Sequence, residues 1–439
     1  MKDPADGTQT ETELDGRIDP ESGLPILAMP REGMPPLVDD DALLAECIEA
    51  LGSGTGPVAI DTERAQSFRY SGRAYLLQLR RSGAGTWLID PQAFEPGDGS
   101  VADLGALREA IIDAEWIIHA ASSDLPCLVE LGLLPERLFD TELAGRLLGL
   151  PRVGLGPMTE SYFGVHLLKE HSAADWSKRP LPADWVAYAA LDVELLAELR
   201  DALSTELRVA GKAQWAAQEF EYERTRPPRP TRVDPWRRTP HAGRAVRTPR
   251  SLAVLRELWI AREKLAAELD RTPSRVLSHQ ALIAAAITRP TSRRKLVAIK
   301  EFSSRQTRQH QEVWWEAVDR AMHLPESDLP PVHAPLPDGE LPQPRSWGRH
   351  HPEAARALEV VRLTVRSRAD ELRLPQELLL SPDSQRHLAW DLGRAREAGA
   401  PADTSTPAVA ARLTELEARP WQVEQVGPAL SEALTTALA

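Results

Sequence analysis

The 439-residue chain has little cysteine and no long apolar run. Its two cysteines, Cys47 and Cys127, are too few for a disulfide framework or a cysteine-rich zinc site, and they suit a reducing compartment. No stretch of 18 apolar residues is present, and the polar, acidic first residues lack the apolar segment of a signal peptide. We therefore expect a soluble, cytoplasmic protein without disulfides.

The charge of the chain is unevenly distributed. The formal net charge of −13 by itself argues against a nucleic-acid partner. Residues 224–250, however, carry nine arginines and one acid, Asp234. Residues 247–320 carry fifteen Lys/Arg against eight Asp/Glu. This clustering favours a phosphate-binding middle of the chain, and the alternative is that arginine serves here only as a solubilising residue.

The length exceeds that of one compact core, so several domains are expected. Strand-like and helix-like segments alternate in the first half, which predicts an α/β fold with a central sheet. Later segments have helical periodicity only, and two proline-rich stretches separate them. The predicted parts are a disordered acidic N-terminus (1–35), an α/β domain (36–225), an Arg/Pro-rich linker (226–247), a helical domain (248–325), a Pro-rich linker (326–348) and a second helical domain (349–439). We interpret the second helical domain as a diverged duplicate of the first helical domain.

Within the α/β region, the periodicity predicts individual elements. Apolar runs bounded by turn residues predict strands, and apolar positions three and four apart predict helices. The predicted strands are 56–61, 74–81, 85–91 and 115–121, and the predicted helices are 104–114, 124–134, 141–149 and 182–208.

Carboxylates stand at the ends of several of these elements. Asp61 and Glu63 follow an apolar strand, and residues i and i+2 of a strand share a face, so the two acids repel each other unless a cation lies between them. Asp124 follows another strand, and Tyr188 and Asp192 share a helix face. Singly, each has a structural alternative, such as a helix N-cap for Asp124. Together they predict one site.

Four carboxylates without a histidine or cysteine cluster suit hard divalent cations such as Mg²⁺ or Mn²⁺. Two such ions about 3.5–4 Å apart can hold the attacking and leaving oxygens of an in-line phosphoryl displacement. The predicted cofactors are therefore two divalent metal ions. Tyr188 is predicted to orient the attacking water.

The same residues carry a resemblance to a known family. Asp61-x-Glu63, Asp124 after "HAASS" and Tyr188-x-x-x-Asp192 resemble the three motifs of the DEDDy 3′–5′ exonucleases. The segments "HAASSDLPCL", "FDTELAGRLLG" and "ADWSKRPLPADWVAYAALDVELL" resemble ribonuclease D more than the proofreading branch. The helical domain over 248–325 resembles the HRDC domain, and the one over 349–439 resembles a weaker HRDC-like unit.

The resemblance implies a ribonuclease H-like exonuclease domain, with a mixed five-stranded sheet flanked by helices, followed by all-α HRDC-type domains. It implies that Asp61 bridges two metals, that Glu63 and Asp192 complete the nucleophile-side metal, and that Asp124 holds the other through water. The implied activity is removal of 5′-mononucleotides from RNA with a single-stranded 3′ end, in the maturation or turnover of tRNA precursors and other small RNAs.

Further residues are candidates for substrate contact: Thr62, His119, Lys169, Lys178 and Arg179. Packing is the alternative for His119, and a solvated surface is the alternative for Lys169, Lys178 and Arg179. We do not expect His119 to act as a base, because metal-bound water needs no histidine base. Two other functions stay open, a DNA 3′–5′ exonuclease of the Werner type and a catalytically inactive RNA-binding protein. The presence of all five motif residues argues against the inactive protein.

Overall fold

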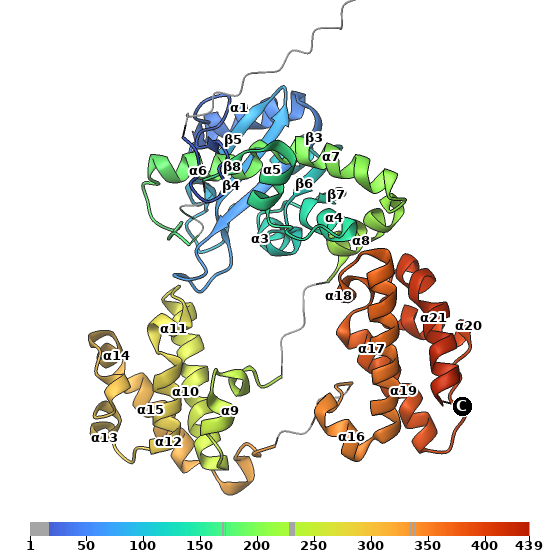
Figure 1. Cartoon of the computed structure of the whole chain (residues 1–439). Coiled ribbons are helices and arrows are strands. Elements are labelled where there is room, and N and C mark those ends of the chain that lie inside the picture. Colours follow the sequence, from blue (N-terminus) through green and yellow to red (C-terminus); the bar gives the residue numbers. More distant parts are fainter. Residues whose placement is uncertain are drawn as a thin grey trace, which may run out of the picture.

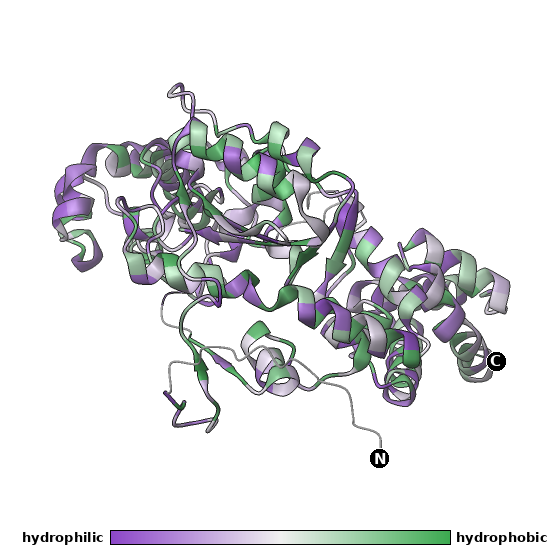
Figure 2. Ribbon diagram, turned by 90° about the horizontal axis from the view of Figure 1, so that it is seen from above, coloured by the Kyte–Doolittle hydropathy of each residue, from purple (hydrophilic) through white to green (hydrophobic). Residues whose placement is uncertain are grey.

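The computed structural model describes residues 17–168, 171, 173–227, 233–333, 336 and 339–438. We name three parts of it: the α/β unit (17–227), the first helical unit (233–333) and the C-terminal helical unit (339–438). Figure 1 shows the α/β unit at the top, with the two helical units below it. Figure 2 shows hydrophobic segments in the central strands and alternating hydrophobic and hydrophilic residues along the helices. No helix among these residues is both long and apolar enough to cross a membrane.

A six-stranded mixed sheet forms the centre of the α/β unit, in the order β2-β5-β4-β3-β6-β7. The β3–β4 and β4–β5 pairs are antiparallel, and the β2–β5, β3–β6 and β6–β7 pairs are parallel. The predicted five-stranded sheet thus gains a two-residue edge strand, β2. The strands are β2 (Leu37–Val38), β3 (Thr55–Arg64), β4 (Ala74–Ser82), β5 (Gly85–Ile89), β6 (Glu115–Ile118) and β7 (Arg137–Asp140).

The central strand β3 extends beyond one of its neighbours. It pairs with β6 only at Val58 and Ala59, whereas its pairing with β4 continues through Asp61 and Glu63. The chain after β6 turns away into the segment that carries Asp124. The end of β3 is therefore open on the β6 side, and side chains from other elements can approach its carboxylates there.

Helices cover both faces of the sheet. Buried side chains of α1, α2 and α3 pack with Val58 and Ile60 on one face. On the other face α6 contacts β3, β4 and β5, and α7 contacts β3 and β6. The helices of this unit are α1 (Asp41–Ser53), α2 (Gly105–Ala110), α3 (Leu125–Glu130), α4 (Thr141–Leu148), α5 (Leu155–Phe163), α6 (Ala183–Glu194), α7 (Leu196–Val209) and α8 (Ala213–Thr225), with 3₁₀ turns η1 (Pro91–Phe94) and η2 (Ala121–Ser123).

The predicted helix over 182–208 is wrong as a single element, because it breaks at Leu195 (φ −112°, ψ 6°) into α6 and α7. Arg31 holds the break: its side chain donates hydrogen bonds to the carboxylate (2.8 Å) and the carbonyl oxygen (3.1 Å) of Glu194. Glu194 is fully buried, and Arg80 lies 3.6 Å from the same carboxylate. The break ends α6 two residues after Asp192.

The prediction of disorder over residues 1–35 is wrong for residues 17–35, and residues 1–16 lie outside the described part. Strand β1 (Ile26–Leu27) pairs in parallel with β8 (His166–Leu167). Leu27 is buried among Leu167, Leu191 and Leu195. Apolar burial and the Arg31–Glu194 ion pair thus fix a segment whose overall composition suggested disorder.

The first helical unit has a core of its own, built around α10, α12 and α15. Trp236 and Val246, within the predicted linker 226–247, are buried in this core, so that part of the linker folds onto the unit. The elements are η3 (Pro235–Arg238), α9 (Ala242–Ala245), α10 (Pro249–Glu268), α11 (Pro273–Val276), α12 (His279–Thr288), α13 (Arg293–Val297), η4 (Lys300–Phe302), α14 (Arg305–Gln309), α15 (Gln311–His323) and η5 (Glu326–Asp328).

The C-terminal helical unit shares a continuous buried core with α7 and α8 of the α/β unit. Trp215 stacks on Trp421 at 4.8 Å between ring centroids, and Glu219 accepts two hydrogen bonds from Arg419 (2.6 and 2.7 Å). Its elements are η6 (Pro344–Ser346), α16 (Trp347–His350), α17 (Pro352–Leu372), α18 (Gln376–Leu379), α19 (Pro382–Glu397), α20 (Thr406–Glu415) and α21 (Pro420–Leu438). Like α10, the long helix α17 is followed by a four-residue helix. An origin by duplication stays a prediction.

Candidate active site

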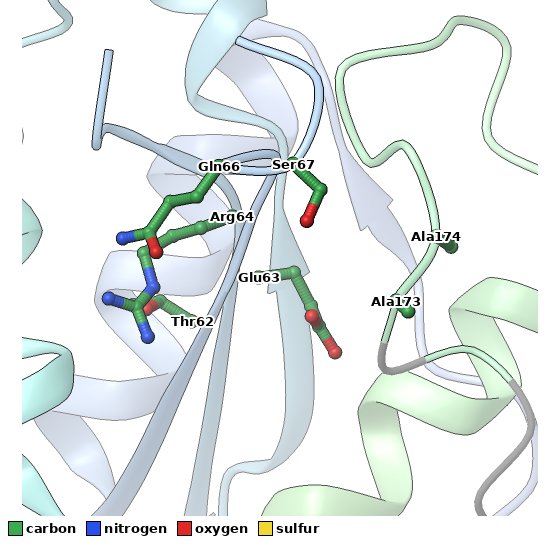
Figure 3. Close-up of a pocket in the computed structure, with 7 residues that line it drawn as sticks. All are labelled: Thr62, Glu63, Arg64, Gln66, Ser67, Ala173 and Ala174. Carbon is green, nitrogen blue, oxygen red and sulfur yellow. The ribbon is translucent and has the colours of Figure 1, made fainter. Parts of the chain in front are cut away.

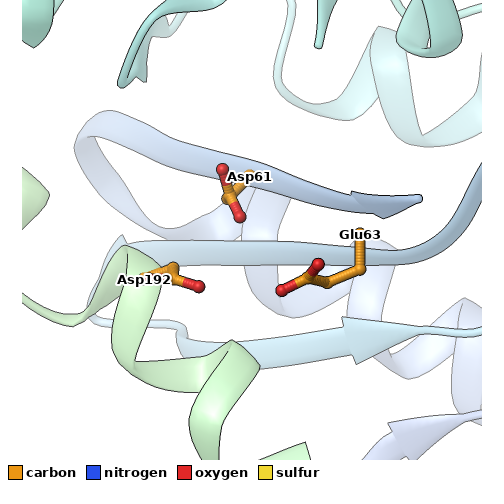
Figure 4. A group of neighbouring side chains, drawn as sticks. All are labelled: Asp61, Glu63 and Asp192. Carbon is orange, nitrogen blue, oxygen red and sulfur yellow. The ribbon is translucent and has the colours of Figure 1, made fainter. Parts of the chain in front are cut away.

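Three of the four predicted carboxylates meet at the open end of β3. Asp61, Glu63 and Asp192 each offer an oxygen, and these oxygens lie within 4.8 Å of one another. Figure 4 shows Asp61 and Glu63 on β3 and Asp192 on the helix beside it. Because side chains two apart in a strand point to the same face, Asp61 and Glu63 lie on one face of the sheet, and α6 packs on that face. An all-oxygen donor set at this spacing fits a hard divalent cation.

The cluster is electrostatically strained. Burial raises the pKa of Asp61 well above its usual value, and the negative charges of Asp124, Asp192 and Glu63 raise it further. Burial, followed by the charges of Asp192 and Asp124, raises the pKa of Glu63 to about 9. Arg64 counteracts this only weakly. The carboxylates therefore favour a proton or a bound cation over the free anionic state.

Asp124 lies beside this group, at the start of α3. It is 4% exposed, and Thr62 Oγ1 donates a hydrogen bond to its Oδ1 (2.5 Å). Its side chain makes no capping hydrogen bond to α3, which removes the N-cap alternative. Burial raises the pKa of Asp124, while Thr62 and Arg64 oppose the rise. Its charge is the largest electrostatic influence on the pKa of Asp61, so Asp124 completes the cluster electrostatically.

A buried acid that the sequence reasoning missed fixes the turn that leads to Asp124. Asp140, at the end of β7, accepts hydrogen bonds from the amides of Ala120 (3.1 Å), Ala121 (2.8 Å) and Leu143 (3.1 Å). Ala120 has φ +61°, a left-handed conformation that L-residues rarely adopt. Asp140 stabilises this turn as well as capping α4. Its position directly before the predicted helix over 141–149, where an aspartate favours an N-cap, was the available signal.

Tyr188 lies one turn before Asp192 on α6 and is 7% exposed. Its ring packs edge-on against His171, at 5.7 Å between centroids. Burial raises the pKa of Tyr188 above its usual value, and the charges of Asp192, Glu63 and Asp61 raise it further. The phenol therefore stays protonated beside the carboxylates and can act as a hydrogen-bond donor.

The predicted substrate contacts have varied surroundings. Thr62 is buried and binds Asp124. His119 Nδ1 lies 2.9 Å from Thr141 Oγ1, and Lys178 is exposed. Lys169 lies outside the described residues.

Arg179 has a structural role in place of the predicted substrate contact. Its guanidinium donates to both carboxylate oxygens of Asp90 and to the carbonyl oxygens of Tyr75, Trp176 and Lys178. These bonds use all five of its N–H groups. Arg179 thus anchors the segment before α6 to the sheet and has no donor left for a phosphate.

A polar pocket with a cavity volume of about 190 Å³ adjoins the cluster. In Figure 3, Glu63 points into the space between β3 and the segment that carries Ala173 and Ala174. The remaining lining residues are Thr62, Arg64, Gln66 and Ser67. The sequence reasoning missed Arg64, Gln66 and Ser67, although they directly follow the first acidic motif.

Comparison with known proteins agrees with this geometry. A family model described as a 3′-5′ exonuclease matches residues 35–208, which include the whole carboxylate cluster. The ribonuclease D of Pseudomonas paraeruginosa is 31% identical over 347 residues, which cover 78% of this chain and 85% of that protein. The chain belongs to the ribonuclease D family. It is a 3′–5′ exoribonuclease with a mixed, helix-flanked sheet, as the resemblance implied.

Two further family models match the helical units. An HRDC domain model matches residues 251–318, and a model described as a 3′ to 5′ exonuclease C-terminal domain matches 340–434. The ribonuclease D of Escherichia coli is 31% identical over 299 residues, 67% of this chain and 76% of that protein. We refer below to the first helical unit as the HRDC domain.

Two solved structures resemble nearly the whole chain. A protein from Bifidobacterium adolescentis superposes with a TM-score of 0.81 at 38% identity, over 94% of this chain and 100% of the other. Escherichia coli RNase D is described as an exoribonuclease involved in structured RNA processing. It superposes with a TM-score of 0.63 at 26% identity, over 92% of this chain and 99% of that protein. The likeness to both structures therefore extends beyond the α/β unit into the helical units.

Proposed function

We propose that this member of the ribonuclease D family removes 5′-mononucleotides from RNA with a single-stranded 3′ end, using two Mg²⁺ or Mn²⁺ ions held by Asp61, Glu63, Asp124 and Asp192. The observation that supports this most is the position of Asp61, whose pKa is raised by the charges of all three other carboxylates. Divalent ions supply positive charge that stabilises in-line phosphoryl transfer and ease the ionisation of the attacking water. The acids alone repel phosphate and cannot supply that charge.

The protein groups around the cluster then act by orientation. Tyr188 stays protonated, so its hydroxyl can donate a hydrogen bond that orients the attacking water. Thr62 holds the carboxylate of Asp124, and Asp140 holds the turn before it. The pocket beside Glu63 provides room for the terminal nucleotide.

RNA affinity is proposed to come from the HRDC domain more than from the whole arginine-rich middle. Arg224 and Arg226 pair with acids of α8, Arg237 pairs with Asp234, and residues 229 and 232 lie outside the described part. Residues 289–308, by contrast, carry seven Lys/Arg and one acid. The exposed cations of this stretch without an ion pair among the described residues are Arg289, Arg294, Lys295, Lys300, Arg305 and Arg308. A tRNA precursor or another structured small RNA would fit such a surface.

The test of the reaction uses end-labelled single-stranded RNA and DNA of one sequence. We expect release of mononucleotides from the RNA 3′ end with Mg²⁺ or Mn²⁺, and loss of release with a chelator. Faster release from DNA would favour the Werner-type alternative. No metal-dependent release from either strand would leave the inactive RNA-binding protein as the better description.

The test of the binding surface uses the full-length protein. Replacing Arg305 and Arg308 by Gln should reduce the steepness of log Kd against log salt by about 1.4, since each single-strand phosphate contact contributes about 0.7. Replacing Arg412, which pairs with Asp391 on the C-terminal unit, is the matched control. An unchanged slope in the double variant would refute this surface.

A further inference from the structure

The loop of residues 65–73 joins β3 to β4 and forms one wall of the catalytic pocket. Gln66 and Ser67 of this loop line the pocket together with Glu63 (Figure 3). Two internal backbone hydrogen bonds, both accepted by the carbonyl oxygen of Ala65, shape the loop. A loop with so few internal bonds takes its position from whatever it packs against.

The turn after α10 and the start of α11 in the HRDC domain contact this loop through residues 270–275, which we name the HRDC corner. The Thr272 hydroxyl lies within hydrogen-bond distance of the carbonyl oxygens of Gln66 (2.8 Å) and Arg69 (3.1 Å), which share its single proton. The backbone N–H of Thr272 donates to the carbonyl oxygen of Phe68 (3.1 Å). One threonine thus binds three loop residues across about 200 positions of sequence.

Two further residues of the HRDC corner complete the contact. Arg275 Nε donates to the carbonyl oxygen of Ser67 (2.8 Å), and its guanidinium lies over the ring of Phe68, 4.2 Å from the centroid. Asp270 Oδ1 accepts hydrogen bonds from the amides at positions 70 (3.2 Å) and 71 (3.0 Å). Every residue from 66 to 71 therefore gives one backbone group to the HRDC domain.

The loop also reaches the opposite wall of the pocket. Arg69 Nε donates to Ser177 Oγ (2.7 Å), and Ser177 Oγ donates to Asp175 (2.5 Å). Ala173 and Ala174, just before Asp175, form that opposite wall. A displacement of the loop would therefore change the position of both walls of the pocket beside Glu63.

We propose that the HRDC corner fixes the 66–71 wall of the catalytic pocket in the position that receives the 3′-terminal nucleotide. The inference rests on the proposed exonuclease function and adds a second task for the HRDC domain, which sets the rate of hydrolysis as well as RNA affinity. Asp270, Thr272 and Arg275 act through the loop and are positioning residues. Small misplacement of a reacting group lowers rates strongly, so the effect should be visible in kcat.

The test compares Thr272→Val with Thr272→Ser in the full-length protein. Valine keeps the shape and the backbone N–H but removes the hydroxyl that binds two loop carbonyls, while serine keeps that hydroxyl. On a dinucleotide, the shortest RNA with one phosphodiester bond, we expect kcat to fall about tenfold in the valine variant and to stay within about twofold in the serine variant. The affinity for long RNA, measured in an Asp61→Ala background, should not change.

A second measurement is independent of turnover. Hydrogen exchange of the 65–73 amides should quicken in the valine variant and not in the serine variant. Asp270→Gly provides another test, because glycine fits the left-handed backbone at this position (φ +43°) and removes only the carboxylate. It too should lower kcat and quicken exchange.

Three results would overturn the role of the HRDC corner: wild-type kcat in Thr272→Val, an equal loss in Thr272→Ser, or unchanged exchange in the loop. The proposed function is judged separately, by metal-dependent hydrolysis in the wild-type protein.

Discussion

The affinity of the acidic cluster for Mn²⁺ should rise steeply with pH. Burial and the charges of Asp192 and Asp124 raise the pKa of Glu63 to about 9, against an ordinary value of 4.5. Near neutral pH the metal-free protein therefore holds a proton on this carboxyl group. A metal ion must displace that proton before it binds, because only the carboxylate is a good ligand.

The size of the effect follows from the shift. At pH 7 the pKa of Glu63 lies about two units above the pH, and removing the proton costs roughly 3 kcal/mol. This cost falls as the pH approaches 9. The proton of Glu63 alone should lower the Kd for Mn²⁺ by roughly thirtyfold between pH 6.5 and 8.0.

The same shift has a defined sign for stability. A pKa raised in the folded state means that the folded protein binds more protons than the unfolded chain between about pH 4.5 and 9. The stability of the metal-free protein therefore falls as the pH rises through this window. Added Mn²⁺ should offset the loss, so the increase in Tm caused by the metal should grow with pH.

Calorimetry of the full-length protein with Mn²⁺, in two buffers of different ionisation enthalpy, measures both the affinity and the protons released. Glu63→Gln is the control, since its amide has no proton to release, and its pH slope should be smaller by about one proton. An affinity that does not change with pH would refute the reasoning. So would equal proton release in the glutamine variant.

Further predictions concern single side chains. Asp61→Ala should lower metal-dependent RNA hydrolysis by roughly a thousandfold or more with an unchanged circular dichroism spectrum, and substantial residual turnover would contradict the metal assignment. Tyr188→Phe should lower kcat by about a hundredfold with little change in Mn²⁺ affinity, and a wild-type rate would remove its orienting role. Arg31→Ala should lower the free energy of unfolding, measured in urea, by about 3 kcal/mol. The buried carboxylate of Glu194 would lose the guanidinium of Arg31 and keep, among the described residues, the backbone N–H of residue 31 (3.4 Å) and Arg80 at 3.6 Å. Arg31→Lys keeps the positive charge and should lower the free energy of unfolding by less. Equal losses in the two variants would show that this charge is not what stabilises the fold.

Local periodicity carried much of the sequence prediction. The two-residue alternation of a strand predicted that Asp61 and Glu63 share one face of β3. The helical period predicted that Tyr188 and Asp192 share one face of α6. These relations depend on backbone geometry over a few residues, so they can be read before any fold is known. The motif order then led to the ribonuclease D family and to its mixed sheet, which the comparisons confirm.

The partners of charged residues could not be predicted in the same way. Arg179 seemed suited to a phosphate, yet Asp90, 89 positions earlier in the chain, accepts two of its hydrogen bonds. Several arginines of the basic middle are paired within the protein, which composition cannot show. The prediction of disorder near Arg31 was wrong for a related reason. The partner that holds Arg31 in place, Glu194, lies 163 positions away in the sequence.

The sequence by itself determined which residues could form the site, because motif spacing and periodicity act along the chain. Only the tertiary structure decided that Asp124 binds Thr62 in preference to capping its own helix. It alone brought the HRDC corner onto the wall of the pocket, about 200 residues away in sequence. Those contacts depend on which elements pack together, and packing is settled by burial summed over the whole chain, which no short segment encodes.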